Sequence, residues 1–300
     1  MQVVVIANPV AGTSHGRIGG ETARELLTGR GAEVVLHTTD HPGHATDLAR
    51  DSAGSADVVV AVGGDGTLME TATGMVGTGC PLAVLPSGSG NDFATANGIT
   101  NLEVGLESVF AGNIRELDVG DLDGDLFFNS VGLLGSGMVS AAAARLWRWL
   151  GRYRYVVAGG WVILRMSGQR VRWLAPGCEE AVIDDRFMLV EICNGPLTGG
   201  GFRFAPDAAF DDGLLDICLV RTMSAWTGLG LLPKASRGRI IDHGAVSVIR
   251  SPDMQFESDE PVGYHRDGEA GVLSPGRHRI RVREEKLLFC RPANQGTEVA

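Results

Sequence analysis

The segment Ala61-Val62-Gly63-Gly64-Asp65-Gly66-Thr67 is followed about twenty residues later by Pro86-Ser87-Gly88-Ser89-Gly90-Asn91-Asp92-Phe93. Each glycine-rich turn comes directly after an apolar run and before a helix-favouring stretch. A chain presents backbone N–H groups to phosphate at such a turn, and glycine lets the phosphate approach closely. A carboxylate at Asp65 is tolerable beside phosphate oxygens when a divalent cation such as Mg²⁺ joins them. Two such turns predict a nucleotide phosphate site, whereas one alone would also suit a hairpin turn.

The first 125 residues alternate between strand-like and helix-like patterns, which predicts an α/β domain with a parallel sheet and right-handed crossovers. Ligands bind such sheets at the carboxyl ends of the strands, so Asn8, Thr39 and the two turns should converge. The expected strands are residues 3–7, 33–38, 58–62, 82–85 and 114–119, and the expected helices are residues 19–28, 45–52, 68–75, 92–97 and 102–111.

From Gly120 onward the sequence changes to short β-like segments separated by turn signals, which predicts an all-β sandwich. The expected domains are a nucleotide-binding α/β domain at residues 1–121 and a β-sandwich domain at residues 122–285. A final strand near residues 286–291 would return to the first domain. The other expected strands are residues 126–129, 181–183, 187–193, 214–220, 245–250, 254–257 and 278–282.

Composition favours a globular protein of the reducing cytosol. The formal net charge is −10, which argues against a general nucleic-acid binder, and 44% of residues are hydrophobic. Five scattered cysteines form no CxxC pair. No apolar run reaches the roughly 20 residues that a bilayer-spanning helix needs, and the amino terminus lacks the basic region of a signal peptide.

Two common nucleotide-binding motifs are missing from the sequence. The only lysines, Lys234 and Lys286, lie far from any glycine-rich turn, so there is no GxxxxGK[ST] loop. The first strand leads into Asn8-Pro9-Val10-Ala11-Gly12 instead of the GxGxxG of dinucleotide-binding folds. A phosphate site in this chain must therefore depend on backbone amides, a metal ion and arginine.

Together these motifs resemble the diacylglycerol kinase catalytic family, which includes bacterial lipid kinases, sphingosine kinases and ceramide kinases. The resemblance implies a phosphofructokinase- or NAD kinase-like first domain, a β-sandwich second domain and an ATP site in the cleft between them. It is carried by Asn8-Pro9 with Gly12, Thr39 with Gly43 and Ala45, the two turns with Glu70, Asp118-Val119-Gly120, Asn194-Gly195-Pro196, Gly199-Gly200-Gly201-Phe202, Ala205-Pro206-Asp207-Ala208, Asp212-Gly213-Leu214-Leu215-Asp216 and Asp267-Gly268-Glu269.

The resemblance also implies roles for individual residues in binding ATP and Mg²⁺. Asp65 and Asp118 would belong to a catalytic magnesium network. Asp212, with the backbone carbonyls of Ala209 and Leu214, would form a structural magnesium site; the alternative is a hairpin turn whose aspartate caps its own backbone. The residues implied to contact ATP are Asn8, Thr39, Gly63, Gly64, Asp65, Gly66, Thr67, Leu68, Glu70, Ser89 and Asn91.

Phosphoryl transfer to an alcohol requires an oriented hydroxyl and a group that accepts its proton. Asp267-Gly268-Glu269 places two carboxylates on one short turn. The resemblance implies that Glu269 is the general base and Asp267 its orienting or metal-linked partner. The two roles can be exchanged, Asp65 is a third candidate, and an exposed polar turn without a catalytic role is the alternative.

The stretch from Leu126 to Cys178 contains no acidic residue but mixes arginine with tryptophan. This composition suits the surface of an anionic membrane, and it also suits stacking on nucleic acid or a core whose arginines reach the surface. The residues are Arg145, Arg148, Arg152, Arg154, Arg165, Arg170 and Arg172, with Trp147, Trp149, Trp161 and Trp173.

The sequence therefore predicts an ATP- and Mg²⁺-dependent lipid kinase whose acceptor is diacylglycerol-like. An NAD kinase-like enzyme and an inactive nucleotide- or lipid-binding protein are the alternatives. We expect a cytoplasmic protein that contacts the anionic inner face of the membrane peripherally, binds no nucleic acid and can form a homodimer.

Overall fold

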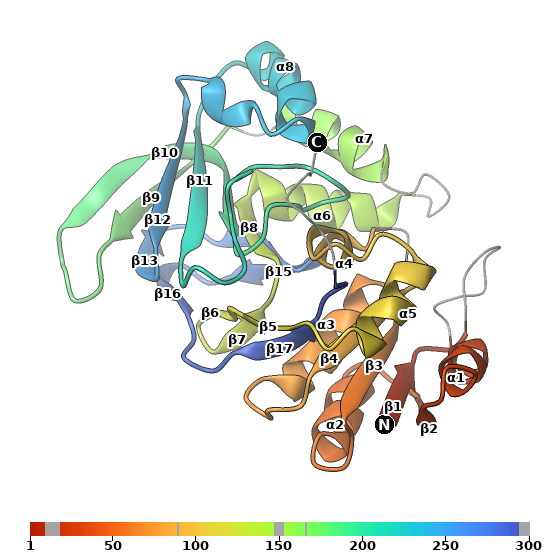
Figure 1. The fold of residues 1–300 in the computed structure, drawn as a ribbon. Coiled ribbons are helices and arrows are strands. Elements are labelled where there is room, and N and C mark those ends of the chain that lie inside the picture. Colours follow the sequence, from red (N-terminus) through yellow and green to blue (C-terminus); the bar gives the residue numbers. More distant parts are fainter. Residues whose placement is uncertain (10–18, 89, 147–152, 166, 294–300) are drawn as a thin grey trace. The chain divides into compact units, whose positions relative to one another are not determined.

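The computed structural model describes residues 1–9, 19–88, 90–146, 153–165 and 167–293, and the chain divides into two compact units (Figure 1). The first unit comprises Met1–Leu117 with Glu284–Ala300, and the second comprises Asp118–Arg283. Each unit has its own sheet and its own hydrophobic core.

The first unit is a six-stranded sheet of order β2-β1-β3-β4-β17-β5. Strands β2, β1, β3 and β4 are parallel, and the valine-rich β3 is buried along its whole length, as expected where both faces of a sheet are covered. The elements are β1 (Gln2–Ala7), α1 (Gly20–Thr28), β2 (Glu33–Thr38), α2 (His44–Ser52), β3 (Val58–Gly63), α3 (Asp65–Met75), β4 (Leu82–Pro86), α4 (Asp92–Ala96), α5 (Leu102–Phe110), β5 (Ile114–Leu117) and β17 (Leu287–Cys290).

The last strand of the chain completes this first sheet. Strand β17 pairs in parallel with β4 and antiparallel with β5. The expected return of the C-terminal strand to the first unit is therefore observed.

The second unit is an antiparallel, sandwich-like sheet of eleven strands. The long strand β10 pairs with β9 over its first half and with β8 and β11 over its second half, so it joins the two parts of the sheet. The strands are β6 (Gly120–Leu122), β7 (Asp125–Phe127), β8 (Ser130–Leu134), β9 (Gln169–Leu174), β10 (Ala181–Cys193), β11 (Leu215–Arg221), β12 (Val246–Ser251), β13 (Asp253–Ser258), β14 (Val262–Arg266), β15 (Glu269–Leu273) and β16 (Gly276–Val282).

Helices in the second unit are the main departure from the expected architecture. Helix α6 (Gly135–Arg145) contacts β8, β14 and β15, α7 (Tyr153–Ile163) packs on α6, and α8 (Ala225–Ser236) packs on α7 (Figure 1). A short 3₁₀ turn, η2 (Ile240–Asp242), follows α8. Within the part of the chain that the structure describes, no helix has both the length and the apolarity required to cross a bilayer.

Several expected boundaries were wrong for identifiable reasons. Helix α3 begins at Asp65, three residues before the expected start, because the glycine-rich turn is itself the first turn of the helix. The expected strand at residues 114–119 ends at Leu117, because Asp118 is the first residue of the second unit. The two expected strands at 181–183 and 187–193 are one strand, β10, whose acidic middle pairs with the arginines of β9.

Candidate active site

The two glycine-rich turns lie side by side at the carboxyl ends of β3 and β4. The Ser87 backbone N–H donates to the Gly63 carbonyl at 2.8 Å, and a Cβ atom added to Gly88 would lie 2.6 Å from Gly64 Cα. Real side chains do not approach a backbone so closely, so only glycine fits at this contact. The contact brings the first turn of α3 next to the segment that leads into α4.

Asp65 connects the two turns through its carboxylate. Its Oδ2 accepts a hydrogen bond from the Asn91 backbone N–H at 2.8 Å, and a Cβ atom on Gly90 would come within 2.7 Å of the same oxygen. Burial raises the pKa of Asp65, against the opposing effect of hydrogen bonds from the Asn91, Asp65 and Asp92 backbones. A carboxylate has about four lone-pair positions, so Asp65 can bind this backbone and still ligate a cation.

Asn91 shapes the second turn. It has a left-handed backbone (φ 56°), its Oδ1 accepts from the Gly88 N–H at 3.1 Å, and its Nδ2 donates to the Gly88 carbonyl at 3.0 Å. Asparagine tolerates this backbone conformation because its short side chain can hydrogen-bond locally. Asn91 thus fixes the turn from within, while Ser89, also expected to contact ATP, lies outside the described residues.

The other expected nucleotide residues follow the same edge of the first sheet. The Asn8 N–H donates to the Val62 carbonyl at 3.4 Å, and the Thr39 N–H donates to the Ala7 carbonyl at 3.0 Å. The side chain of Thr67 packs against Gly63. Leu68 is buried in the core, and the Glu70 carbonyl accepts from the Thr46 hydroxyl. Asn8, Thr39, Gly63, Gly64, Asp65, Gly66 and Thr67 therefore lie at the ends of neighbouring strands, whereas the Leu68 side chain faces inward.

In the second unit, Asp118 is held against the loop before β11. Its side chain is 3% exposed, and its Oδ2 accepts from the Gly213 N–H at 2.7 Å. The Asp118 N–H donates to the Phe210 carbonyl, and its carbonyl accepts from Asn194 Nδ2 at 2.9 Å. The structure therefore joins Asp118 to the 209–214 segment, a link that the sequence did not reveal.

Asp212 lies on the surface of that segment. Its Oδ1 accepts from the Leu214 N–H at 3.0 Å, as in an aspartate that caps its own turn. Among the described residues, no three His, Cys, Asp or Glu side chains form a metal-binding group. One carboxylate with the Ala209 and Leu214 carbonyls still fits Mg²⁺, which keeps several waters and uses few protein carboxylates.

The two roles of Asp212 make different predictions for two substitutions. If Asp212 binds Mg²⁺, Asp212→Ala and Asp212→Asn should both abolish the rise in melting temperature that Mg²⁺ produces without nucleotide. If it only caps the turn, Asp212→Asn should behave like the wild type, because its amide oxygen can still accept a hydrogen bond from the Leu214 N–H. Asp212→Ala should then lower the free energy of unfolding by about 0.5–2 kcal/mol, with or without Mg²⁺. Thermal melts with Mg²⁺ and with EDTA distinguish the two roles.

The two carboxylates of the Asp267-Gly268-Glu269 turn have different environments. The Asp267 carboxylate accepts from the backbone N–H groups of Phe128, Asn129 and Ser130 at 2.8–2.9 Å. Burial raises the pKa of Asp267 despite these bonds. Glu269 is exposed at the start of β15. Asp267 therefore anchors the turn, and Glu269 is the carboxylate of the turn that remains exposed.

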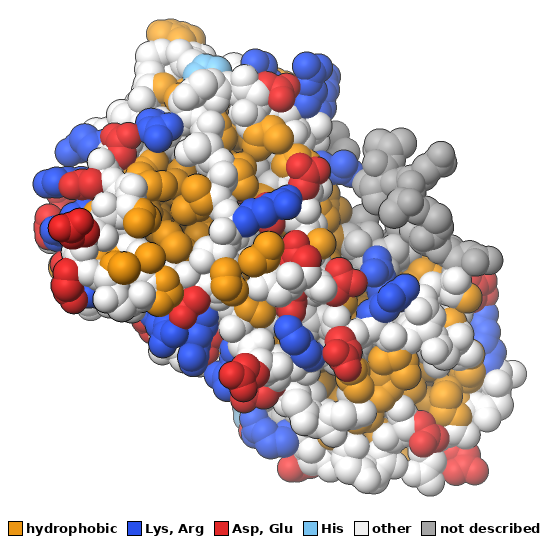
Figure 2. Space-filling model, turned by 60° about the vertical axis from the view of Figure 1, so that its left-hand side comes forward, with side chains coloured by type: hydrophobic (Ala, Val, Ile, Leu, Met, Phe, Trp, Pro, Cys, Tyr) orange, Lys and Arg blue, Asp and Glu red, His pale blue; other side chains and the backbone are white. Residues whose placement is uncertain are grey.

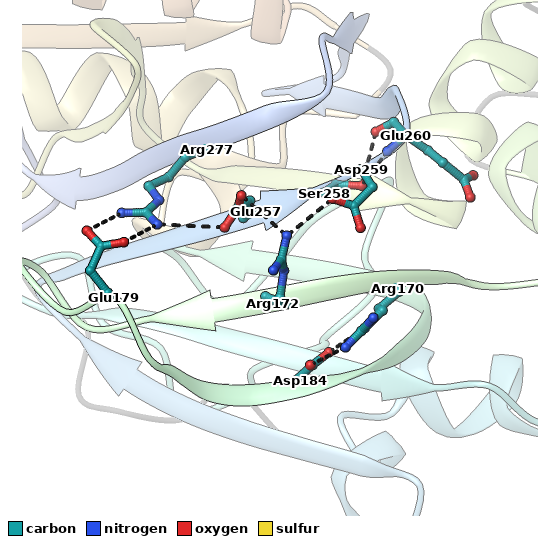
Figure 3. A network of polar contacts seen from close by, with 9 residues as sticks. All are labelled: Arg170, Arg172, Glu179, Asp184, Glu257, Ser258, Asp259, Glu260 and Arg277. Atoms are coloured by element: carbon teal, nitrogen blue, oxygen red, sulfur yellow. Dashed lines mark hydrogen bonds and ion pairs between the residues drawn. The ribbon is translucent and has the colours of Figure 1, made fainter.

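The arginine- and tryptophan-rich segment divides between structural and surface positions. Trp173 is fully buried in the core of the second unit. Arg170 pairs with Asp184, and Arg172 pairs with Glu257 and Asp259 (Figure 3). For these residues the structure matches the core-packing interpretation. Trp147, Arg148, Trp149 and Arg152 lie outside the described residues, as does the side chain of Arg154.

Comparison with known proteins finds similarity over most of the chain. The family profile described as "Diacylglycerol kinase catalytic domain" matches residues 2–122, and "YegS C-terminal NAD kinase beta sandwich-like domain" matches residues 131–288. The chain is 31% identical over 297 residues to the "Probable lipid kinase YegS-like" of Pseudomonas aeruginosa, covering 94% of this chain and 96% of that protein. It is 29% identical over 287 residues to a "Diacylglycerol kinase" of Mycobacterium tuberculosis, covering 91% and 90%.

Solved structures share the same fold. A diacylglycerol kinase structure from Bacillus anthracis str. Sterne aligns with a TM-score of 0.74 at 20% identity, covering 97% of this chain and 96% of that one. An NAD kinase from Archaeoglobus fulgidus, solved in complex with ATP, aligns with a TM-score of 0.53 at 15% identity, covering 97% and 94%. With both units matched by their own profiles, the chain belongs to the diacylglycerol kinase catalytic family.

Proposed function

We propose that this protein transfers the γ-phosphate of Mg-ATP to the hydroxyl group of a diacylglycerol-like lipid. The observation that carries the proposal is the contact between the two glycine-rich turns, with Asp65 bound across them. Such an arrangement supplies backbone N–H groups for phosphate and one carboxylate for a cation. Membership of the diacylglycerol kinase catalytic family supports a lipid acceptor.

Each residue type in the site has a role in this proposal. The N–H groups of the two turns and of the first turn of α3 would bind phosphate oxygens, and a bound Mg²⁺ would supply positive charge to offset the negative charge of the phosphates. Asp65 and Asp118 are the carboxylates proposed to hold the cation. Glu269 accepts the proton of the acceptor hydroxyl, while Asp267 keeps the Glu269 turn in place through three backbone hydrogen bonds.

The proposal is tested by measuring ADP release with and without an acceptor. Purified protein with Mg-ATP should release ADP when vesicles containing diacylglycerol are added, and NAD should not replace the lipid. Parallel assays with a glycerophospholipid and a sphingoid base identify the preferred acceptor. ADP release that depends on NAD would support the NAD kinase alternative, and no release with any acceptor would support an inactive binding protein.

We also propose that helices α7 and α8 dock the protein on an anionic membrane. A lipid acceptor lies in a bilayer, and neither Leu126–Cys178 nor Thr222–Ile241 contains an acidic residue. Trp226 on α8 is 81% exposed, and Trp161 on α7 is half exposed and lies beneath the Arg165 guanidinium, 4.5 Å from its ring centre. Tryptophan beside cationic side chains is typical of membrane-surface helices.

The two helices form one surface because they pack against each other. Leu229 and Leu232 of α8 lie within 4 Å of the positions that Cβ atoms on Gly160 and Gly159 of α7 would occupy. Figure 2 shows Lys and Arg side chains interspersed with Asp and Glu over much of the face that it draws. An acid-free helix pair therefore offers a concentration of positive charge in a protein whose net charge is −10.

A pair of charge reversals on α8 tests the docking surface. Lys234→Glu combined with Arg237→Glu should weaken binding to phosphatidylserine vesicles by at least about 30-fold, since each lost cation near an anionic membrane costs about 1 kcal/mol and the two new carboxylates add repulsion. Arg24→Glu with Arg50→Glu, on the first unit, gives the same change in net charge and should bind normally. Equal binding by the two folded variants, measured by co-sedimentation at low salt, would place the docking surface elsewhere.

A further inference from the structure

Three polar side chains meet inside the second unit, apart from the proposed nucleotide and metal residues. Glu191 on β10 is 0% exposed and His265 on β14 is 6% exposed. The Ser136 hydroxyl, from the first turn of α6, donates to Glu191 Oε2 at 2.5 Å and lies 3.0 Å from His265 Nε2. Glu191 Oε1 lies 3.4 Å from the same imidazole nitrogen. We name Glu191, His265 and Ser136 the buried triad.

A glycine in the strand between β10 and β14 allows the buried triad to form. Glu191 and His265 both pair with Gly132 of β8, one from each neighbouring strand. A Cβ atom on Gly132 would collide with Ser136 Oγ and His265 Nε2. The missing side chain therefore lets two cross-strand neighbours meet over the central strand.

Contacts within the buried triad favour the ionised form of Glu191. Burial would raise the pKa of Glu191, but the charge of His265, with hydrogen bonds from His265 and Ser136, outweighs burial and lowers the pKa. Glu191 and His265 contact each other from the two strands that flank β8, so removing the imidazole would leave the buried Glu191 carboxylate without this partner.

The geometry does not suit a serine nucleophile. A nucleophilic triad needs the serine hydroxyl to donate to histidine and the carboxylate to bind the opposite ring nitrogen. Here the Ser136 hydroxyl donates directly to Glu191. His265 Nδ1 is buried, with no hydrogen-bond partner among the described residues.

Hydrogen bonds connect the buried triad to the Asp267-Gly268-Glu269 turn. The Thr198 hydroxyl donates to Glu191 Oε1 at 3.1 Å, and Ser130 Oγ lies 2.8 Å from Thr198 Oγ1. The Ser130 carbonyl accepts from the Asp267 N–H, while the Ser130 N–H donates to the Asp267 carboxylate. The contacts lead from Glu191 through Thr198 and Ser130 to Asp267. His265 lies two residues before Asp267 in the chain and contacts Glu191, so these contacts form a closed ring.

Helix α6 supports the turn from a second side. The Ser140 hydroxyl donates to the Gly268 carbonyl at 2.8 Å, one turn after Ser136. Leu134 directly precedes α6 and has a backbone conformation that is unusual for a residue other than glycine (φ 60°, ψ −117°). Such a backbone is sparsely populated and persists where the surrounding contacts impose it.

We propose that Glu191 and His265 are positioning residues that hold the Asp267-Gly268-Glu269 turn so that Glu269 can act as the base. This inference rests on the proposed function for the role of Glu269. Ser136, Thr198 and Ser130 transmit the constraint, and Gly132 provides the space. Neither Glu191 nor His265 contacts the reacting atoms in this proposal.

Hydrogen–deuterium exchange on the full chain tests the positioning without an activity assay. In His265→Gln, the amides of Asn129 and Ser130 should exchange about tenfold faster or more, because the ring of contacts that holds their acceptor Asp267 has lost the imidazole. His278→Gln is the matched control: His278 also lies in this sheet and pairs with an aspartate, Asp123, at 2.6 Å. Its exchange in peptides 126–134 and 262–273 should match the wild type.

Kinetics test the consequence for catalysis. Folded His265→Gln should show a kcat for lipid phosphorylation about 10- to 100-fold below the wild type, with an unchanged KM for Mg-ATP, as small displacements of a catalytic group cost rates of this order. A merely structural role would lower the melting temperature and leave kcat per folded molecule unchanged. Thr198→Val, which cuts the ring and leaves the contact between His265 and Glu191, should change exchange and kcat in the same direction.

The possible outcomes separate this inference from the proposed function. Wild-type exchange at Asn129 and Ser130 in folded His265→Gln would overturn it, and so would faster exchange with an unchanged kcat. If His265→Gln does not fold, Thr198→Val provides the same two measurements. If the wild type phosphorylates no lipid, the proposed function fails, while the exchange data still decide whether the buried triad holds the turn.

Discussion

Asp65→Asn is expected to lower lipid phosphorylation by at least about 10²-fold while the protein stays folded, since removal of one preorganised charge-stabilising group typically costs 10²–10³ in kcat. The asparagine oxygen can still accept from the Asn91 N–H, so the contact between the two turns can persist. The lost negative charge removes the proposed ligand of the catalytic cation. Asp51→Asn, an exposed position on α2, is the control and should retain full activity.

Asp65→Asn should lower activity without lowering thermal stability at pH 7, and this expectation follows from the pKa of Asp65. Burial raises the pKa of Asp65 in the folded protein above the unfolded value of about 3.9. A carboxyl group whose pKa is raised by folding lowers the free energy of unfolding when it is ionised, at a pH above its folded-state pKa. This loss of stability disappears as the pH falls toward the pKa of the unfolded state. Asparagine cannot ionise, so the variant should melt at or above the wild-type temperature at pH 7, and this difference should shrink toward pH 4.

If Asp65→Asn phosphorylated lipid at the wild-type rate, Asp65 would not be a ligand of the proposed catalytic cation. A large fall in its melting temperature at pH 7 would show instead that its charge is needed for the contact between the turns. Melts at pH 4 and pH 7, measured beside lipid-dependent ADP release, separate these two roles.

Glu269→Gln is expected to lower kcat by about 10² to 10⁴, the range typical for a positioned general base. Glu269 is exposed, and its turn is fixed by Asp267 and not by Glu269 itself, so the variant should melt like the wild type. The KM for Mg-ATP should not change, because glutamine keeps the size of the side chain. Glu260→Gln, another exposed position in the second unit, serves as the control.

Undiminished turnover by Glu269→Gln would exclude Glu269 as the base. The role would then pass to Asp267 or Asp65, the two other candidate carboxylates. A pH–rate profile of the variant would locate the remaining titrating group.

The first unit was predictable because its signals are local. Runs such as Val58–Val62 are too apolar for an exposed position, and Gly63, Gly64 and Asp65 mark the place where β3 ends. Parallel topology then brings the strand ends together without further information. The start of α3 at Asp65 was missed because glycine is a poor helix former, although here it occupies the first turn, where backbone N–H groups remain available.

The second unit was less predictable because its contacts are distant in sequence. The bonds from Asp267 to Phe128, Asn129 and Ser130 span about 140 residues, and no local pattern encodes them. Helix α6 was missed because its glycine- and alanine-rich sequence has no strong apolar periodicity. One signal was available: Glu191 is an acid inside the apolar run of β10, and an acid at such a position requires a buried partner.

The most direct test of the account is to follow the labelled γ-phosphate of ATP into the lipid phase. Wild-type protein with Mg²⁺, diacylglycerol vesicles and NAD should yield a radiolabelled phospholipid and no labelled NADP on thin-layer chromatography. Asp65→Asn and Glu269→Gln should yield about a hundredth as much or less. Labelled phospholipid at wild-type levels from both variants, or label found in NADP and not in lipid, would contradict the account.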